Sequence, residues 1–224
     1  MSKSSYLIKN MGILTISNFS SKILVFLLVP LYTSVLSTKE YGTYDLAVST
    51  ATLLYPILTL NIVDAVMRFL MDKESDKKAI ASIGLKYVSI SSVLFGFIML
   101  FFYITGIWSD INGLEGYIFS YYISYVINQF FIQFAKGLEK VKNMGVAGVL
   151  STIVTIIANL FFLLVIKWGL IGFFLANILA QIVSAIYLFL KTEIYNYIEI
   201  KRQPIALRRE MLIYSVPLLS LIHI

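Results

Sequence analysis

Long apolar stretches recur along the chain, separated by short polar segments. Six of them are about 20 residues or longer, the length that an α-helix needs to cross a hydrocarbon core of about 30 Å. They are Met11–Val35, Thr43–Phe69, Ser82–Ile107, Gly116–Ala135, Met144–Ile166 and Leu170–Leu190. A seventh begins near Met211 and reaches the last residue before it is long enough to span. Because a backbone in lipid must satisfy its own hydrogen bonds, this pattern predicts an all-α, polytopic transmembrane helix bundle.

The longest polar segment, residues 191–210, follows the sixth span and carries several charges. We expect it to be a linker on the inner surface that completes a six-helix lobe of residues 1–210. Residues 211–224 are then the truncated start of a second lobe, and the chain is an N-terminal part of a longer protein. Pro30 and Pro56 lie within predicted spans, where each should kink its helix.

Basic residues are distributed unevenly over the connections. Of the 18 Lys and Arg residues, 15 lie in the N-terminal tail or in and beside the connections after spans two, four and six. The alternate connections hold only Lys39 and Lys167, and Lys22 lies within span one. The positive-inside rule therefore predicts a multi-pass protein of the bacterial cytoplasmic membrane with a cytoplasmic N-terminus. The net charge of +6 is explained by topology and anionic lipid, without nucleic acid.

Residues that could carry catalysis are few. Cysteine is absent, the single histidine is His223, and none of the common hydrolase, metalloprotease or phosphate-loop motifs occurs. The acidic run from Asp72 to Asp76 fails as a calcium loop, because Lys77 replaces the required glycine. We therefore expect no enzyme, no catalytic residue, no metal site and no cofactor.

Polar residues inside the spans are the candidates for function, because burying them in lipid is costly. At 1.5 Å per residue, Lys22 lies about 16 Å from the inner face, and Asn128 and Gln181 lie about 16–18 Å from the outer face. One cation and amides from other helices thus share the middle of the membrane, with no carboxylate at that level. Asp64 and Arg68 are four residues apart on span two and are expected to form a gate or a structural ion pair.

Several short motifs resemble a known family. The stretches Asn18-Phe-Ser-Ser-Lys22, Leu28-Val-Pro30-Leu-Tyr and Leu36-Ser-Thr-Lys-Glu40-Tyr-Gly42-Thr-Tyr44 are followed by Ala65-Val-Met-Arg68-Phe69 and Ala135-Lys-Gly-Leu138. Together they resemble the bacterial polysaccharide-biosynthesis flippases of the multidrug/oligosaccharidyl-lipid/polysaccharide exporter superfamily. The most specific part is the Glu-Tyr-Gly turn, and Lys136 replaces the commoner arginine.

The resemblance implies two six-helix lobes around a cavity that opens alternately to either side. It implies flipping of undecaprenyl-diphosphate-linked oligosaccharide, with Lys22, Asn18, Asn128 and Gln181 as substrate-binding or translocation residues. The partners would be this lipid-linked substrate, the bilayer, and a polysaccharide polymerase with its glycosyltransferases. Two alternatives stay open: a cation-coupled drug exporter of the same superfamily, and a membrane-embedded glycosyltransferase or polymerase.

Overall fold

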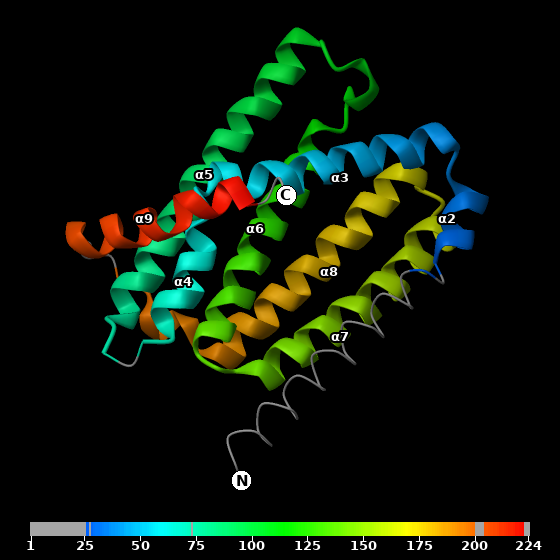
Figure 1. The fold of residues 1–224 in the computed structure, drawn as a ribbon. Helices are drawn as coiled ribbons and strands as arrows, with labels where there is room; N and C mark the ends of the chain where they lie inside the picture. Colours follow the sequence, from blue (N-terminus) through cyan, green and yellow to red (C-terminus); the bar gives the residue numbers. More distant parts are fainter. Residues whose placement is uncertain (1–25, 27, 73, 200–203, 222–224) are drawn as a thin grey trace.

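The protein is a bundle of long helices (Figure 1). The computed structural model describes residues 26, 28–72, 74–199 and 204–221. The helices are α2 (Val29–Val35), α3 (Thr38–Leu58), α4 (Ile62–Leu70), α5 (Lys77–Thr105), α6 (Glu115–Gly137), α7 (Val141–Asn159), α8 (Gly169–Thr192) and α9 (Ile205–Leu221). Short helical turns, η1 (Ser109–Ile111), η2 (Leu160–Val165) and η3 (Ile194–Tyr197), join them. The described residues contain no strand, which confirms the predicted all-α class.

Three helical segments are long and apolar enough to cross a membrane: α5, α7 continued through η2, and α8. A fourth is obtained if α3 and α4 form one bent span. Helix α6 occupies the position of the predicted fourth span but is less apolar, because it carries several tyrosines and amides. The first predicted span lies mostly outside the described residues, which include only its end in α2. Pro30 lies in the first turn of that helix.

The second predicted span is not one continuous helix. Helices α3 and α4 meet at an angle of 60°, and the break falls at Thr59–Asn61. Pro56, where we expected a kink, lies inside α3, and its carbonyl accepts a hydrogen bond from the Asn61 N–H at 2.7 Å. Leu60 and Asn61 both have a φ of 51°, a left-handed conformation that is costly for leucine. The bend is therefore a local structure of several residues, which the single proline did not reveal.

Helix α6 is the centre of the bundle. It contacts α3, α4, α5, α7 and α8, and large aromatic side chains along it are fully buried. The ring of Tyr122 stacks on Phe95 of α5 with ring centres 3.9 Å apart, and Phe130 and Phe134 are completely enclosed. The neighbouring helices thus shield α6 from lipid along much of its length.

The connections alternate between the two ends of the bundle, as the charge pattern predicts. At one end, Lys39 forms an ion pair with Asp110 at 3.0 Å, joining the first turn of α3 to η1. At the other end, Lys78 pairs with Glu199 at 2.7 Å, and Lys140 donates to the carbonyl of Lys191. The hydrogen bond and the attraction to Glu199 raise the pKa of Lys78. Both ion pairs are exposed, so each adds little to stability.

The Glu-Tyr-Gly turn has a structural explanation. Ser37 is the N-cap of α3: its hydroxyl accepts from the Glu40 N–H, and the Glu40 carboxylate accepts from the Ser37 N–H at 2.8 Å. This reciprocal arrangement is a capping box, which satisfies backbone donors at a helix start. The Ser37 hydroxyl also donates to the Glu40 carboxylate at 2.7 Å, and the bond from the Ser37 N–H together with this one lowers the pKa of Glu40. The acidic run also supplies a cap, since Asp76 accepts from the N–H groups of Lys78 and Ala79 at the start of α5.

Helix α9 begins at Ile205 rather than near Met211, and it packs against α4. The rings of Phe69 and Tyr214 meet edge to face with centres 6.1 Å apart. The proposed division of the chain at residue 210 stays a prediction.

Glycine allows the closest helix contact around α6. A Cβ atom built at Gly84 of α5 would lie 2.5 Å from Cε2 of Phe130 and 2.6 Å from Cγ2 of Val66. We therefore predict that Gly84→Ala lowers the free energy of unfolding by about 1–3 kcal/mol, the usual cost of overpacking. Reversible unfolding of the purified complete protein in mixed micelles measures it.

The matched control is Gly148→Ala on α7, where a Cβ would meet nothing within 4 Å. Because alanine favours a helix over glycine by up to about 1 kcal/mol, this exchange should be neutral or stabilising. Equal destabilisation by both exchanges would contradict the packing argument.

Candidate polar translocation site

Helix α6 carries a row of polar side chains at four-residue intervals: Tyr121, Tyr125, Gln129 and Gln133. Residues four apart lie above one another on a helix, so these four form one stripe, which we call the α6 polar stripe. The rings of Tyr121 and Tyr125 stack with centres 6.0 Å apart. Tyr121 is buried and the other three are half-buried. Three of the four side chains in the stripe therefore keep part of their surface accessible.

Helices α3 and α4 contribute to this stripe from either side of their bend. Tyr55 of α3 meets Tyr125 edge to face, with ring centres 5.5 Å apart. Asp64, in the first turn of α4, accepts a hydrogen bond from Nε2 of Gln133 at 2.6 Å. The half-buried carboxylate thus has an amide donor on the central helix. The bend between α3 and α4 is what sets the course of the helix that bears Asp64.

Asn128 and Gln181, both predicted as site residues, lie in direct contact. Nδ2 of Asn128 donates to Oε1 of Gln181 at 2.5 Å, joining α6 to α8. The estimate of similar depth from the sequence is consistent with this bond. Their role in substrate binding stays a prediction, because an amide pair of this kind also holds membrane helices together.

Four buried polar atoms have no hydrogen-bond partner within the described part of the chain: Oδ1 of Asn128, Oε1 of Gln133, Oδ1 of Asn159 and the hydroxyl of Tyr122. Three of them are amide oxygens, which can accept two hydrogen bonds each. Such buried, unpaired groups are uncommon in folded proteins and usually imply a ligand, water or other partner. Two of the four belong to α6 amides that already hold a partner on another helix through their nitrogen atoms.

Asn159 marks an irregularity that the sequence analysis did not foresee. It is fully buried, its Nδ2 donates to the Thr155 carbonyl at 2.8 Å, and η2, a π-helical stretch, begins at the next residue. A π-helix inserts extra backbone into a helix and often accompanies functional sites. The π-helical stretch has the uniformly apolar sequence Leu-Phe-Phe-Leu-Leu-Val, which gives no signal for a π-helix.

The expected ion pair between Asp64 and Arg68 is not formed among the described residues. Asp64 lies half-buried against α6, whereas Arg68 is exposed in the last turn of α4. The carboxylate therefore takes Gln133 as its partner. The spacing of four residues permits an ion pair within α4, but the contact with α6 gives Asp64 a different partner. A gating role for either residue stays a prediction.

Lys22 and Asn18 lie outside the described residues, so their predicted roles also remain predictions. Sequence analysis overlooked Gln133 and the tyrosines, because it scored only amides and charges near the midplane. The four-residue spacing from Tyr121 to Gln133 was the signal that could have revealed the stripe.

The fold and polar interior are those of an all-α, multi-pass membrane protein. A family model described as "Polysaccharide biosynthesis protein" matches residues 7–221, and the chain belongs to that family. A comparison with curated proteins found no match.

Two solved structures share the fold. One is a MOP superfamily transporter from Pyrococcus furiosus, 19% identical, with a TM-score of 0.61. The other is a multidrug resistance MATE family transporter of the MOP superfamily in an outward-facing conformation, 16% identical, with a TM-score of 0.62. Each match covers 95% of this chain and 49% of the solved chain, so this chain spans about half the length of either structure.

The contact between Asn128 and Gln181 leads to a stability prediction. In a double-mutant cycle with Asn128→Leu and Gln181→Leu, we expect a coupling energy of about 0.6 kcal/mol and at most about 1.7 kcal/mol, the range of hydrogen bonds between membrane helices. Unfolding of the purified protein in mixed micelles measures each variant. Ser92, whose hydroxyl bonds only within α5, provides the control: Asn128→Leu and Ser92→Ala should be additive. If the effects of Asn128→Leu and Gln181→Leu on the free energy of unfolding are additive, the hydrogen bond between these residues contributes nothing to stability.

Proposed function

We propose that this chain forms one lobe of a transporter that moves lipid-linked oligosaccharide across the membrane and performs no bond chemistry itself. The observation that carries the proposal is the α6 polar stripe, a row of hydroxyl and amide groups along the central helix of the bundle. Membership of the polysaccharide biosynthesis family supports a glycan substrate. The shared fold with MOP superfamily transporters supports movement of that substrate by alternating access.

The chemistry of the stripe suits a carbohydrate. Amide groups can donate and accept at the same time, which matches the hydroxyl groups of sugars. Tyrosine offers an apolar ring face together with a polar tip. Within the described residues, Oε1 of Gln133 in the stripe is buried and has no hydrogen-bond partner. A sugar group that must move through the lobe requires a row of weak binding sites rather than one tight site.

The bend between α3 and α4 suits a moving lobe. Its two residues of left-handed conformation store strain, and strained backbone often lies at functional switch points. Asp64 follows the bend directly and is held to α6 by a single side-chain bond. We propose that this bond closes and opens as the lobe changes conformation.

Lys22 completes the proposal as the counter-charge for the diphosphate or for acidic sugars. It is the cation placed nearest the middle of the membrane by the sequence, and an intramembrane cation without an acid partner is a candidate for binding an anionic substrate. Loss of transport in Lys22→Gln, but not in Lys22→Arg, at equal abundance is the expected pattern. The lipid-linked substrate would come from glycosyltransferases and pass to a polymerase, which are the proposed partners.

The stripe is tested by Gln129→Leu and Gln133→Leu in the complete protein. We expect each exchange to lower surface glycan by about tenfold, because loss of one or two hydrogen bonds to the moving group costs about 1–2 kcal/mol. Surface glycan and membrane abundance are measured together in cells that lack any other flippase for that glycan.

Ser89→Val on α5 is the control, because that exposed hydroxyl bonds only to the Leu85 carbonyl of its own helix. Normal surface glycan in both glutamine variants would refute the role of the stripe. The amount of lipid-linked oligosaccharide separates the alternatives. A transport defect leaves it undiminished, and a glycosyltransferase defect abolishes it. If both glutamine variants lost only drug resistance, the drug-exporter alternative would replace the proposal.

We also propose that the N-terminus lies in the cytoplasm. Apart from Lys39 and Lys167, the described basic residues lie in or beside the α4–α5 and α6–α7 connections and the segment after α8, and Figure 1 shows that these connections share one end of the bundle. Cysteines introduced at Ser75 and Ser109 of this cysteine-free chain test the orientation. We expect an impermeant thiol reagent to label position 109 in intact cells and position 75 only after the membrane is opened. The reverse pattern would invert the topology.

A further inference from the structure

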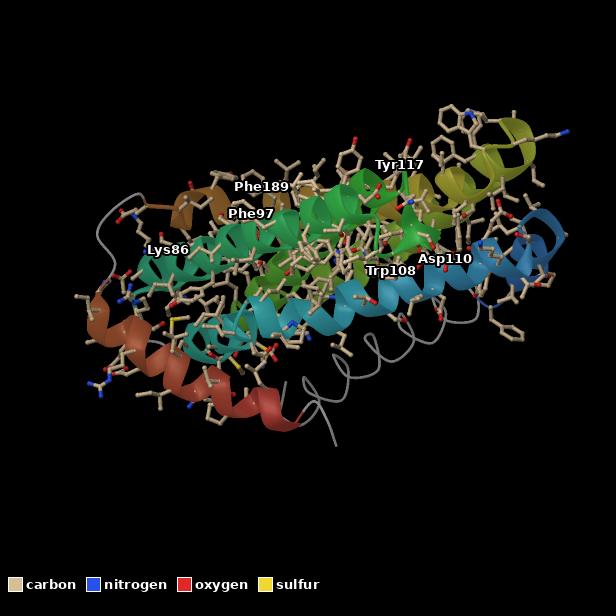
Figure 2. All side chains as sticks on the ribbon, turned by 90° about the horizontal axis from the view of Figure 1, so that it is seen from above. Lys86, Phe97, Trp108, Asp110, Tyr117 and Phe189 are labelled. Atoms are coloured by element: carbon tan, nitrogen blue, oxygen red, sulfur yellow. The ribbon has the colours of Figure 1, made fainter. Side chains whose placement is uncertain are left out.

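An apolar groove of about 900 Å³ runs between α6 and α8. Gly116 and Tyr117 line it near the start of α6, and Phe131 and Phe189 line it near the ends of the two helices. Figure 2 shows Tyr117 and Phe189 on the side of the molecule away from α3 and α9. Asn128 and Gln181 join the two helices along the groove without lining it. The groove and the polar stripe thus lie on different sides of α6.

We propose that this groove binds the hydrocarbon chain of a polyprenyl lipid whose anionic headgroup lies at the lysine-rich end of α6 and α8. The inference rests on the proposed function, and it assigns the lipid part of the substrate to a separate surface from the sugar part. Three observations support it: the chemistry of the lining, the length of the groove and the charge at its ends.

The lining is almost entirely apolar, with the Tyr117 hydroxyl as its main polar group besides two serines. Its side chains are almost all aliphatic or aromatic, and its two serines are already satisfied within α6. The hydroxyl of Ser120 donates to the Gly116 carbonyl at 2.7 Å, and that of Ser124 donates to the Tyr121 carbonyl at 2.9 Å. These small residues leave room between the helices, and their hydroxyl protons are already donated to the backbone. A hydrocarbon chain is the complementary occupant.

The groove is longer than one leaflet. From Gly116 to Phe131 it follows α6 for about 22 Å at 1.5 Å per residue. Half of the hydrocarbon core is only about 15 Å. An ordinary phospholipid chain fills one leaflet, whereas a polyprenyl chain is long enough to follow a groove that passes the midplane. Length therefore favours the polyprenyl lipid over bulk phospholipid.

The two ends differ in charge. Lys136 and Lys191 lie in the last turns of α6 and α8, and Lys140 is held beside Lys191 by a bond to its carbonyl. Two exposed acids, Glu139 and Glu193, lie in the same connections, so the net charge there stays positive with Lys142 included.

At the other end of the groove Glu115 precedes Gly116, and its carboxylate accepts from the Gly113 N–H. A phosphate headgroup is therefore attracted to the lysine end, where it lies beside the end of the apolar groove.

The test measures lipid binding to the purified complete protein in nanodiscs, without any transport assay. The probes are undecaprenyl phosphate, dioleoyl phosphatidylglycerol and inorganic diphosphate. We expect Ile182→Trp, which fills the groove, to weaken undecaprenyl phosphate binding by about tenfold. Ile153→Trp is the matched control, because Ile153 is similarly exposed on α7 and does not line the groove. Lys136→Gln should also weaken binding, and Lys86→Gln on α5 should not.

A photoreactive side chain at position 182 keeps the proposal falsifiable if the tryptophan variant folds poorly. A crosslink to undecaprenyl phosphate supports the proposal. A crosslink to another part of the protein would show that the groove is covered, and would overturn it. Equal binding of phosphatidylglycerol, or unchanged binding in Ile182→Trp, would also overturn it. Because lipid binding is measured directly, the two proposals can fail separately. The groove proposal can be refuted while the stripe variants still lose transport, and the stripe proposal can be refuted while lipid binding still depends on the groove.

Discussion

The structure depends on keeping the polar side chains of α6 out of lipid. An unsatisfied amide or hydroxyl in an apolar medium costs several kcal/mol, so a helix that carries tyrosines, Asn128, Gln129 and Gln133 cannot face the hydrocarbon freely. Five other helices therefore contact α6. Gln181 and Asp64 supply specific partners from α8 and α4. The apolar helices α5, α7 and α8 then present their own hydrophobic surfaces outward, where many of the exposed leucine, isoleucine and phenylalanine side chains lie.

The sequence predicted the helices better than their irregularities. Span positions and the alternation of connections follow from hydropathy and charge, which act over many residues and average out local error. The bend at Leu60 and Asn61 depends instead on two backbone conformations, and Pro56 indicates a disturbance without locating it. The π-helix after Asn159 has an ordinary apolar sequence. Local backbone choices of this kind are decided by tertiary packing, which a single sequence does not display.

The candidate site was predicted in part for the same reason. Depth along a helix is a one-dimensional estimate, and it placed Asn128 and Gln181 at levels that allow contact. Which way a side chain faces depends on the arrangement of the neighbouring helices. The sequence alone therefore could not show whether Asp64 pairs with Arg68 on its own helix or with Gln133 on α6. The Glu-Tyr-Gly motif shows a different limit of sequence analysis: a specific match to a family need not identify a functional residue. It was the most specific resemblance, and in the structure its glutamate caps α3, a local role that fixes the turn.

The two proposals assign the two halves of an amphiphile to two faces of α6. A lipid-linked oligosaccharide joins a very polar group to a long hydrocarbon chain, and no single surface suits both. The polar stripe offers hydroxyls and amides, whereas the groove beside α8 offers hydrocarbon surface with its serines already bonded to the backbone. Because both faces belong to the same rigid helix, their separation is fixed by its diameter of about 10–12 Å. If the two proposals hold, the substrate is bound by both faces of α6. The diphosphate that links its lipid to its sugars must then pass around the end of α6, at the lysine-rich end of the helix. The position of those lysines is then a consequence of the geometry of the amphiphile as well as of topology.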